Sequence, residues 1–163
     1  MSHRVVITGL GVITPVGTGK EEYWNNLLAG VSGVRRVEFP HVEMDQYRTQ
    51  IAATVEDFEP SKFLLNGKKV KYMGRTSLFA LAATKLALED AGFNLSYEKG
   101  KARMSEVDPF KIGVILGAAS GNMDIVEEAA AHCIDNKGPR RLSSLVLPYQ
   151  LICTGASGVA IDC

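Results

Sequence analysis

The chain has 163 residues, 46% apolar and 22% charged, and its 18 basic and 18 acidic side chains cancel to a net charge of zero. This length fits one domain, and the composition supplies a hydrophobic core, so intrinsic disorder is excluded. A neutral chain has no overall field that attracts nucleic acid or an anionic membrane, and no apolar run approaches the ~20 residues that span a bilayer. We therefore expect neither nucleic acid nor membrane as a partner.

We expect no secretion signal, because the apolar run after Arg4 is too short for the hydrophobic region of a signal peptide. Cys133, Cys153 and Cys163 are odd in number and scattered, which is typical of reduced thiols rather than a disulfide framework. We expect a cytoplasmic protein.

The first predicted element is a strand over residues 4–9 (RVVITG), which is rich in β-branched residues, as in strands buried on both faces. Residues 9–17 hold three glycines and a proline, so the backbone should turn there. An amphipathic helix is predicted over residues 20–29. Residues 31–69 have a weaker pattern, with one edge strand near residues 49–54.

The second half is predicted to contain three helices and one strand. Residues 75–90 are predicted to form a helix packed on most sides, residues 97–109 a loop, and residues 111–117 (KIGVILG) a second buried strand. A turn of small residues, 118–121, leads to a helix over residues 123–135 whose acidic first turns complement the helix dipole. A last helix, opened by Pro148, is predicted over residues 148–161.

Strands apolar on both faces that alternate with helices indicate an α/β fold, in which helices cover a largely parallel sheet. We expect residues 5–8 and 112–116 to be neighbours in that sheet. The chain stops inside an apolar pattern at Cys163, so we expect it to be truncated.

Residue patterns for common sites are weak. Gly9-Leu10-Gly11 follows a strand, but Thr14 stands where a dinucleotide fingerprint needs its third glycine and Pro15 where its helix should run. His3, His41 and His132 are far apart, so we expect no metal site and no cofactor. Cys153 is predicted to lie inside the last helix, where the amides that could activate a thiolate are already bonded.

Several segments together resemble the β-ketoacyl-acyl carrier protein synthases, the condensing enzymes of fatty acid and polyketide synthesis. The most specific is VVITGLGVITPVG at residues 5–17. Further matches are Trp24 with LLAGVSG (27–33), RTSLFALAA (75–83), EDAG (89–92), IGVILG (112–117), GPRR (138–141) and Leu147-Pro148. One departure is Gly74, where many relatives have Asp.

The resemblance implies a thiolase-like fold, of which residues 1–163 would be the N-terminal half. It also implies that the nucleophilic cysteine of the family lies beyond Cys163, with its two histidines further on. None of the three cysteines matches the family motif, so no catalytic residue is assigned to this chain, and we expect the chain alone to be inactive.

In relatives, the turn after the strand matching residues 112–116 lines the acyl pocket, and the segment between Gly138 and Pro148 lies near the dimer partner. The resemblance thus makes Ser120, Gly121, Leu145 and Val146 candidates for the acyl-pocket wall. The alternative for residues 118–121 is a compact turn without a binding role.

The implied reaction is the decarboxylative Claisen condensation of a 3-oxoacyl-[acyl carrier protein] synthase. Its implied partners are acyl carrier protein bearing acyl or malonyl thioesters and, for the complete protein, a second copy in a homodimer. The alternative is a non-catalytic split half or a subunit like a chain-length factor, which only shapes a pocket and an interface.

Overall fold

The computed structural model describes residues 4–39, 42–64, 73–98, 101–104 and 107–162. By contacts, the chain divides into two compact units. One unit consists of residues 12–58, and the other combines residues 1–11 with residues 59–163.

The smaller unit begins with a tight hairpin in the glycine-rich segment. Strand β1 (Ile13–Thr14) pairs antiparallel with β2 (Gly17–Thr18), and Thr14 Oγ1 accepts the N–H groups of Val16 and Gly17 at 3.3 and 3.2 Å. Helix α1 (Lys20–Leu28) follows as expected, and Asn26 Nδ2 donates to the carbonyl of Val16 at 2.6 Å. The segment predicted only to turn therefore holds two short strands.

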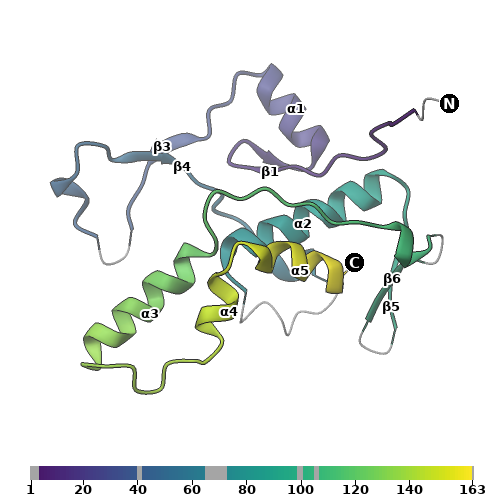
Figure 1. Ribbon diagram of the computed structural model, residues 1–163. Coiled ribbons are helices and arrows are strands. Elements are labelled where there is room, and N and C mark those ends of the chain that lie inside the picture. Colours follow the sequence, from purple (N-terminus) through teal and green to yellow (C-terminus); the bar gives the residue numbers. More distant parts are fainter. Residues whose placement is uncertain (1–3, 40–41, 65–72, 99–100, 105–106, 163) are drawn as a thin grey trace. The chain divides into compact units, whose positions relative to one another are not determined.

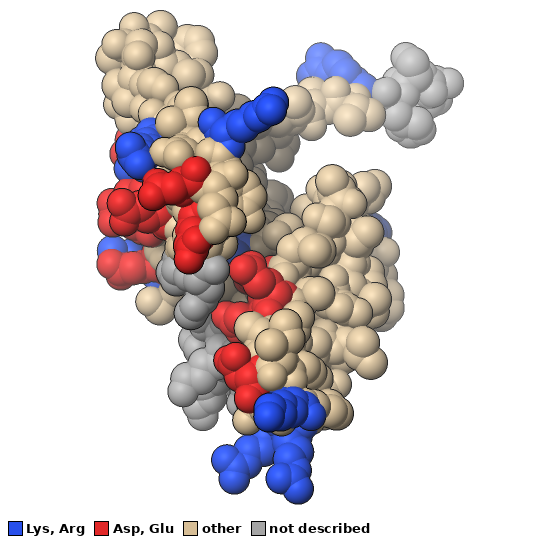
Figure 2. Space-filling model, turned by 90° about the vertical axis from the view of Figure 1, so that its left-hand side faces the viewer, with Lys and Arg blue, Asp and Glu red and all other residues tan. Residues whose placement is uncertain are grey.

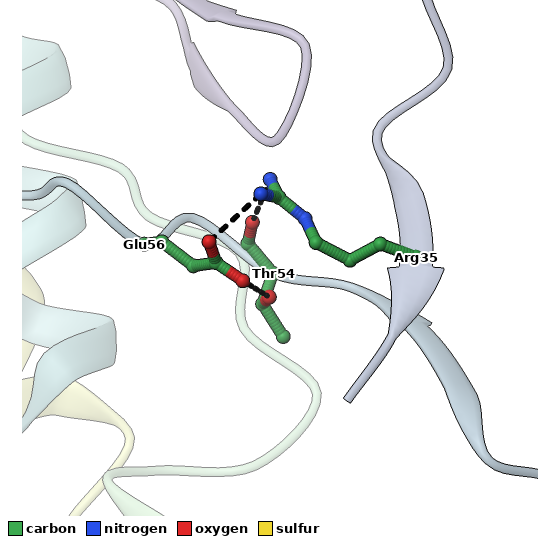
Figure 3. Close-up of polar contacts among 3 residues, drawn as sticks. All are labelled: Arg35, Thr54 and Glu56. Atoms are coloured by element: carbon green, nitrogen blue, oxygen red, sulfur yellow. Dashed lines mark hydrogen bonds and ion pairs between the residues drawn. The ribbon is translucent and has the colours of Figure 1, made fainter. Parts of the chain in front are cut away.

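A second hairpin completes this unit. Strand β3 (Val34–Arg36) pairs antiparallel with β4 (Ile51–Ala53), with the short 3-10 helix η1 (Met44–Gln46) between them, which confirms the strand expected near residues 49–54. Figure 3 shows Arg35 reaching across to the chain beyond β4. Its guanidinium lies 2.8 Å from Glu56 Oε2 and donates to the carbonyl of Thr54 at 3.3 Å.

The larger unit is organised around helix α2 (Arg75–Asp90), against which α5 (Cys153–Asp162) packs (Figure 1). Leu78, Leu81 and Ala82 of α2 and Val159 of α5 are buried. Gly158 permits the close packing, because a Cβ atom there would lie 2.6 Å from the terminal methyl of Met73 and 3.6 Å from Leu81. A turn of 3-10 helix, η2 (Pro60–Lys62), precedes α2.

The remaining elements of this unit include one β-hairpin. Strands β5 (Leu95–Glu98) and β6 (Lys101–Met104) pair antiparallel, so the prediction of a loop over residues 97–109 was wrong. The 3-10 turn η4 (Pro109–Lys111), helix α3 (Met123–Asp135) and the short helix α4 (Val146–Gln150) follow. The bounds of α2 and α3 confirm the helices predicted over residues 75–90 and 123–135.

The helix predicted over residues 148–161 is divided in two. Leu151 has extended backbone angles (φ −64°, ψ 144°) and separates α4 from α5. Pro148 lies within the first turn of α4 rather than opening the last helix. Proline is tolerated there because the N–H groups of a first helical turn have no partner within the helix.

The predicted strand pairing between residues 5–8 and 112–116 is not formed. Each of the three sheets in the described chain is an antiparallel pair of strands, and both segments are extended without a ladder. A strand that is apolar on both faces needs a layer on each side. Here Val5, Ile7 and Ile115 are 91%, 84% and 100% exposed, so neither segment is covered on both faces.

Within the described ranges, none of the helices combines sufficient length and apolar character to cross a membrane.

Candidate functional site

The Gly9-Leu10-Gly11 segment lies directly on α2. A Cβ atom at Gly9 would overlap the carbonyl oxygen of Ala87, and one at Gly11 would lie 2.7 Å from the amide nitrogen of that residue. Between the two glycines, the N–H of Leu10 donates to Asp90 Oδ2 at 3.0 Å. These glycines allow a close approach of backbone to helix, which explains their spacing without a nucleotide.

The candidate wall begins at the turn of residues 118–121, which leads into α3. Gly121 lies on the carboxyl end of α4, because a Cβ atom there would overlap the carbonyl oxygen of Gln150 and lie 3.1 Å from the carbonyl carbon of Leu151. Ser120 beside it is exposed. The absence of a side chain at residue 121 therefore allows the turn to lie directly against α4.

The other two candidate residues are at the opposite end of α4. Leu145 is the N-cap of this helix and is 40% exposed, and Val146 is its first residue and is half-buried. Four residues of helix rise separate Val146 from Gln150, or roughly 6 Å. The structure therefore places Gly121 and the pair Leu145–Val146 at the two ends of one short helix, with Ser120 next to Gly121.

Asn122 is the residue of this region that the sequence reasoning missed. Its side chain is 1% exposed, and its Oδ1 accepts the N–H of Ser77 at 3.0 Å. Its Nδ2 donates to Ser77 Oγ at 2.9 Å and to the carbonyl of Tyr149 at 2.6 Å. The only signal in the sequence is an asparagine directly before a predicted helix, which reads as an ordinary N-cap.

Cys153 lies at the start of a helix and not in its interior, so the predicted interior position was wrong. It is the first residue of α5 and is exposed, because the helix breaks at Leu151 and Ile152. Cys133 is half-buried within α3. Cys163 lies outside the described residues.

The structure describes one of the three histidines. His132 is half-buried in the last turn of α3, and its Nε2 is 2.6 Å from the carbonyl oxygen of Arg140, so it holds the following loop. His3 and His41 lie outside the described residues. In the part of the chain that the structure describes, three or more His, Cys, Asp or Glu side chains nowhere gather as a metal site would require.

Comparison with known proteins decides the family. The model of the β-ketoacyl synthase N-terminal domain matches residues 2–163. The chain belongs to the β-ketoacyl synthase family. One relative of this ketosynthase segment is 3-oxoacyl-[acyl-carrier-protein] synthase 2 of Synechocystis sp., which is 32% identical over 156 residues, covering 96% of this chain and 34% of the relative.

Solved ketosynthases share the fold. The ishigamide ketosynthase/chain length factor superposes with a TM-score of 0.73 at 25% identity, covering 95% of this chain and 36% of that chain. A type II polyketide ketosynthase in complex with its acyl carrier protein superposes with a TM-score of 0.71 at 17% identity, covering 98% of this chain and 40% of that one. These neighbours confirm the thiolase-like fold class.

The ketosynthase segment spans about a third of the length of the curated relatives that it matches. Those relatives are 3-oxoacyl-[acyl-carrier-protein] synthases, condensing enzymes that transfer acyl groups. The resemblance to this family is therefore confirmed, and the match covers the segment in which the four candidate wall residues lie.

Proposed function

We propose that this chain supplies the wall of the acyl pocket in a 3-oxoacyl-[acyl carrier protein] synthase, and that the wall includes Ser120, Gly121, Leu145 and Val146. The observation that carries the proposal is the family match over residues 2–163, within which the turn before α3 rests on α4. Residue volume at such a wall sets how long an acyl chain the pocket accepts.

The proposed reaction has two stages. A cysteine thiolate attacks the carbonyl carbon of an acyl thioester, the C–S bond to the carrier breaks, and the acyl group passes to the enzyme. Malonyl carrier protein then loses CO2, and its α-carbon forms a C–C bond with the acyl carbon while the enzyme C–S bond breaks. Oxyanion stabilisation lowers the barrier to both attacks.

The chain itself contributes no group to these steps in this proposal. None of its cysteines matches the family's nucleophile motif, and Cys153 and Cys133 are free thiols at the start of α5 and within α3. We therefore infer that the 163-residue chain alone cannot condense acyl groups. A cytoplasmic location and a homodimer, both expected from the sequence, belong to the same proposal.

The proposed partner is acyl carrier protein. One solved neighbour is a ketosynthase in complex with such a carrier, and the curated relatives are named for the same substrate carrier. The pocket selects which acyl chains the enzyme accepts from the carrier, so this selection is tested at the wall residues.

A second candidate is a subunit that shapes the pocket without catalysing the reaction. The solved ishigamide protein, with which this chain superposes at a TM-score of 0.73, pairs a ketosynthase with a chain length factor. The two candidates share the wall and differ in whether the complete gene product contains the nucleophile.

The test is a condensation assay of the complete gene product with acyl and malonyl carrier proteins of defined chain length. Wild-type protein should form a 3-oxoacyl product, and Ser120→Leu should shift the preferred substrate to shorter acyl chains. Ser157→Leu, at an exposed position of α5, is the matched control and should leave the preference unchanged. An active enzyme whose preference does not respond to residue 120 would remove Ser120 from the wall, and absence of condensation would favour the non-catalytic subunit.

A further inference from the structure

Asn122 occupies the N-cap position of α3 but does not cap that helix. No side-chain hydrogen bond runs from Asn122 to its own first turn. An asparagine at this position ordinarily accepts an N–H from the second or third residue of the helix that it starts. Its three hydrogen bonds go instead to α2 and α4.

The side chain of Asn122 caps helix α2 in place of an N-cap side chain. The N-cap of α2 is Gly74, which has no side chain to offer, and the third residue of the helix is Ser77. The N–H of Ser77 is the donor that Asn122 Oδ1 accepts. The start of α2 is therefore capped by a residue 45 positions along the chain.

Gly74 and Asn122 compete for one volume. A Cβ atom at residue 74 would lie 2.5 Å from Asn122 Cγ and 2.7 Å from its Oδ1. A side chain at position 74 and the asparagine at position 122 therefore cannot both be accommodated. Gly74 has the extended backbone angles of an N-cap (φ −69°, ψ 162°). A carboxylate at position 74 could therefore cap α2 from the N-cap position of that helix, provided that residue 122 were small.

At α4, Asn122 bonds to a backbone carbonyl rather than to a helix N–H. Its Nδ2 donates to the carbonyl of Tyr149 at 2.6 Å. Asn122 directly follows Gly121, whose backbone lies against Gln150. Turn and helix are therefore joined by a backbone contact and an adjacent buried hydrogen bond. Both α2 and α4 are held by the same amide group.

We propose that Asn122 is the positioning residue of the acyl-pocket wall, fixing the turn of residues 118–121 against α4 through Tyr149. This inference rests on the proposed function, since it gives a role to the wall named there. The same side chain also caps α2. Substitutions can separate this capping from the bond to Tyr149.

Two variants separate them. Asn122→Asp keeps an acceptor for the N–H of Ser77 but replaces the donor to Tyr149 with a carboxylate oxygen, which repels the carbonyl. The double variant Gly74→Asp/Asn122→Gly moves the cap of α2 to position 74 and removes the hydrogen bond from residue 122 to the carbonyl of Tyr149. Asn136→Asp, at the exposed C-cap of α3, is the matched control for the change from amide to carboxylate.

The first readout is amide hydrogen exchange, measured on the complete gene product. Amides of residues 145–151 should exchange at least tenfold faster in both Asn122 variants than in the wild type, while the amide of Ser77 stays protected in the double variant. Asn136→Asp should leave residues 145–151 unchanged. Unchanged protection of residues 145–151 in the double variant would overturn the proposal, and this variant alone decides if Asn122→Asp fails to fold.

The second readout is the acyl chain-length preference of the complete synthase, which a purely structural role would not move. The double variant should accept a broader range of acyl chains than the wild type while remaining folded. Faster exchange with an unchanged preference would overturn the positioning role. An inactive wild-type enzyme would instead defeat the proposed function, and this inference with it, whatever the exchange data show.

Discussion

Gly11 lies so close to α2 that a Cβ atom at residue 11 would overlap the carbonyl oxygen of Ala83. A Cβ atom at Gly9 would likewise clash with Ala87 and Ala91. The two glycines therefore contact helix residues that are spaced four apart. The contacts are mainly with the backbone of the helix, so the approach requires glycine at residues 9 and 11.

Gly9→Ala and Gly11→Ala should therefore each destabilise the protein by about 2 kcal/mol or more, because the overlap is with helix backbone, which cannot rotate away. Gly113→Ala and Gly117→Ala are the controls, since a Cβ atom at either position would have no neighbour within 4 Å. Chemical denaturation measures all four. Equal effects at residues 11 and 113 would refute the packing described here.

These contacts also show how far the sequence could predict the fold. The bounds of α2 and α3 followed from apolar residues, small residues and end signals within each helix, and these are local. The role of Gly9 and Gly11 did not follow, because it depends on a helix some 70–80 residues away in sequence that has small residues on the facing side.

The two strands predicted over residues 4–9 and 111–117 do not form, for a related reason. Their composition correctly indicates segments suited to burial on both faces, but a strand forms only where a partner supplies hydrogen bonds and both faces are covered. At the other end of the chain, Pro148 predicts the start of a helix, and no local pattern indicates that the backbone becomes extended at Leu151.

Within the candidate site, the small residues before α3 could be predicted as a turn, and the family resemblance supplied its proposed role. The importance of Asn122 could not, because an asparagine before a helix has the same local pattern whether it caps that helix or bonds elsewhere. Only its bonds to Ser77 and Tyr149 distinguish the two.

Asp124 gives a second cap to α2. Its Oδ2 accepts the N–H of Arg75, the first residue of that helix, at 2.7 Å. Asp124→Ala should lower the free energy of unfolding by about 1 kcal/mol, as the loss of a capping side chain does. Glu127→Ala removes the same charge one turn later in α3, and we expect it to cost less than half as much; the comparison is made by thermal unfolding.

The Arg35–Glu56 ion pair should contribute little. Its side chains are 44% and 52% exposed, and exposed pairs are worth about 0–1 kcal/mol. A double-mutant cycle with Arg35→Ala and Glu56→Ala should give a coupling free energy below about 1 kcal/mol that shrinks in high salt. A larger, salt-independent coupling would contradict the exposure of the two side chains.

The isolated chain should associate with itself. Val5, Ile7 and Ile115 are almost fully exposed, and Figure 2 shows broad areas without charged side chains on one face of the molecule. Exposed apolar patches of this kind promote association. Sedimentation at increasing concentration should show oligomers, and Ile7→Lys/Ile115→Lys should reduce them, whereas a wild-type monomer at all concentrations would contradict the prediction.

The central claim is that this ketosynthase segment builds part of an acyl pocket but does not contain the nucleophile. Intact-mass measurement of the 163-residue chain after incubation with an acyl thioester tests it most directly. We predict no stable acyl adduct. Stoichiometric acylation of one cysteine, abolished by Cys153→Ser or Cys163→Ser, would contradict the claim.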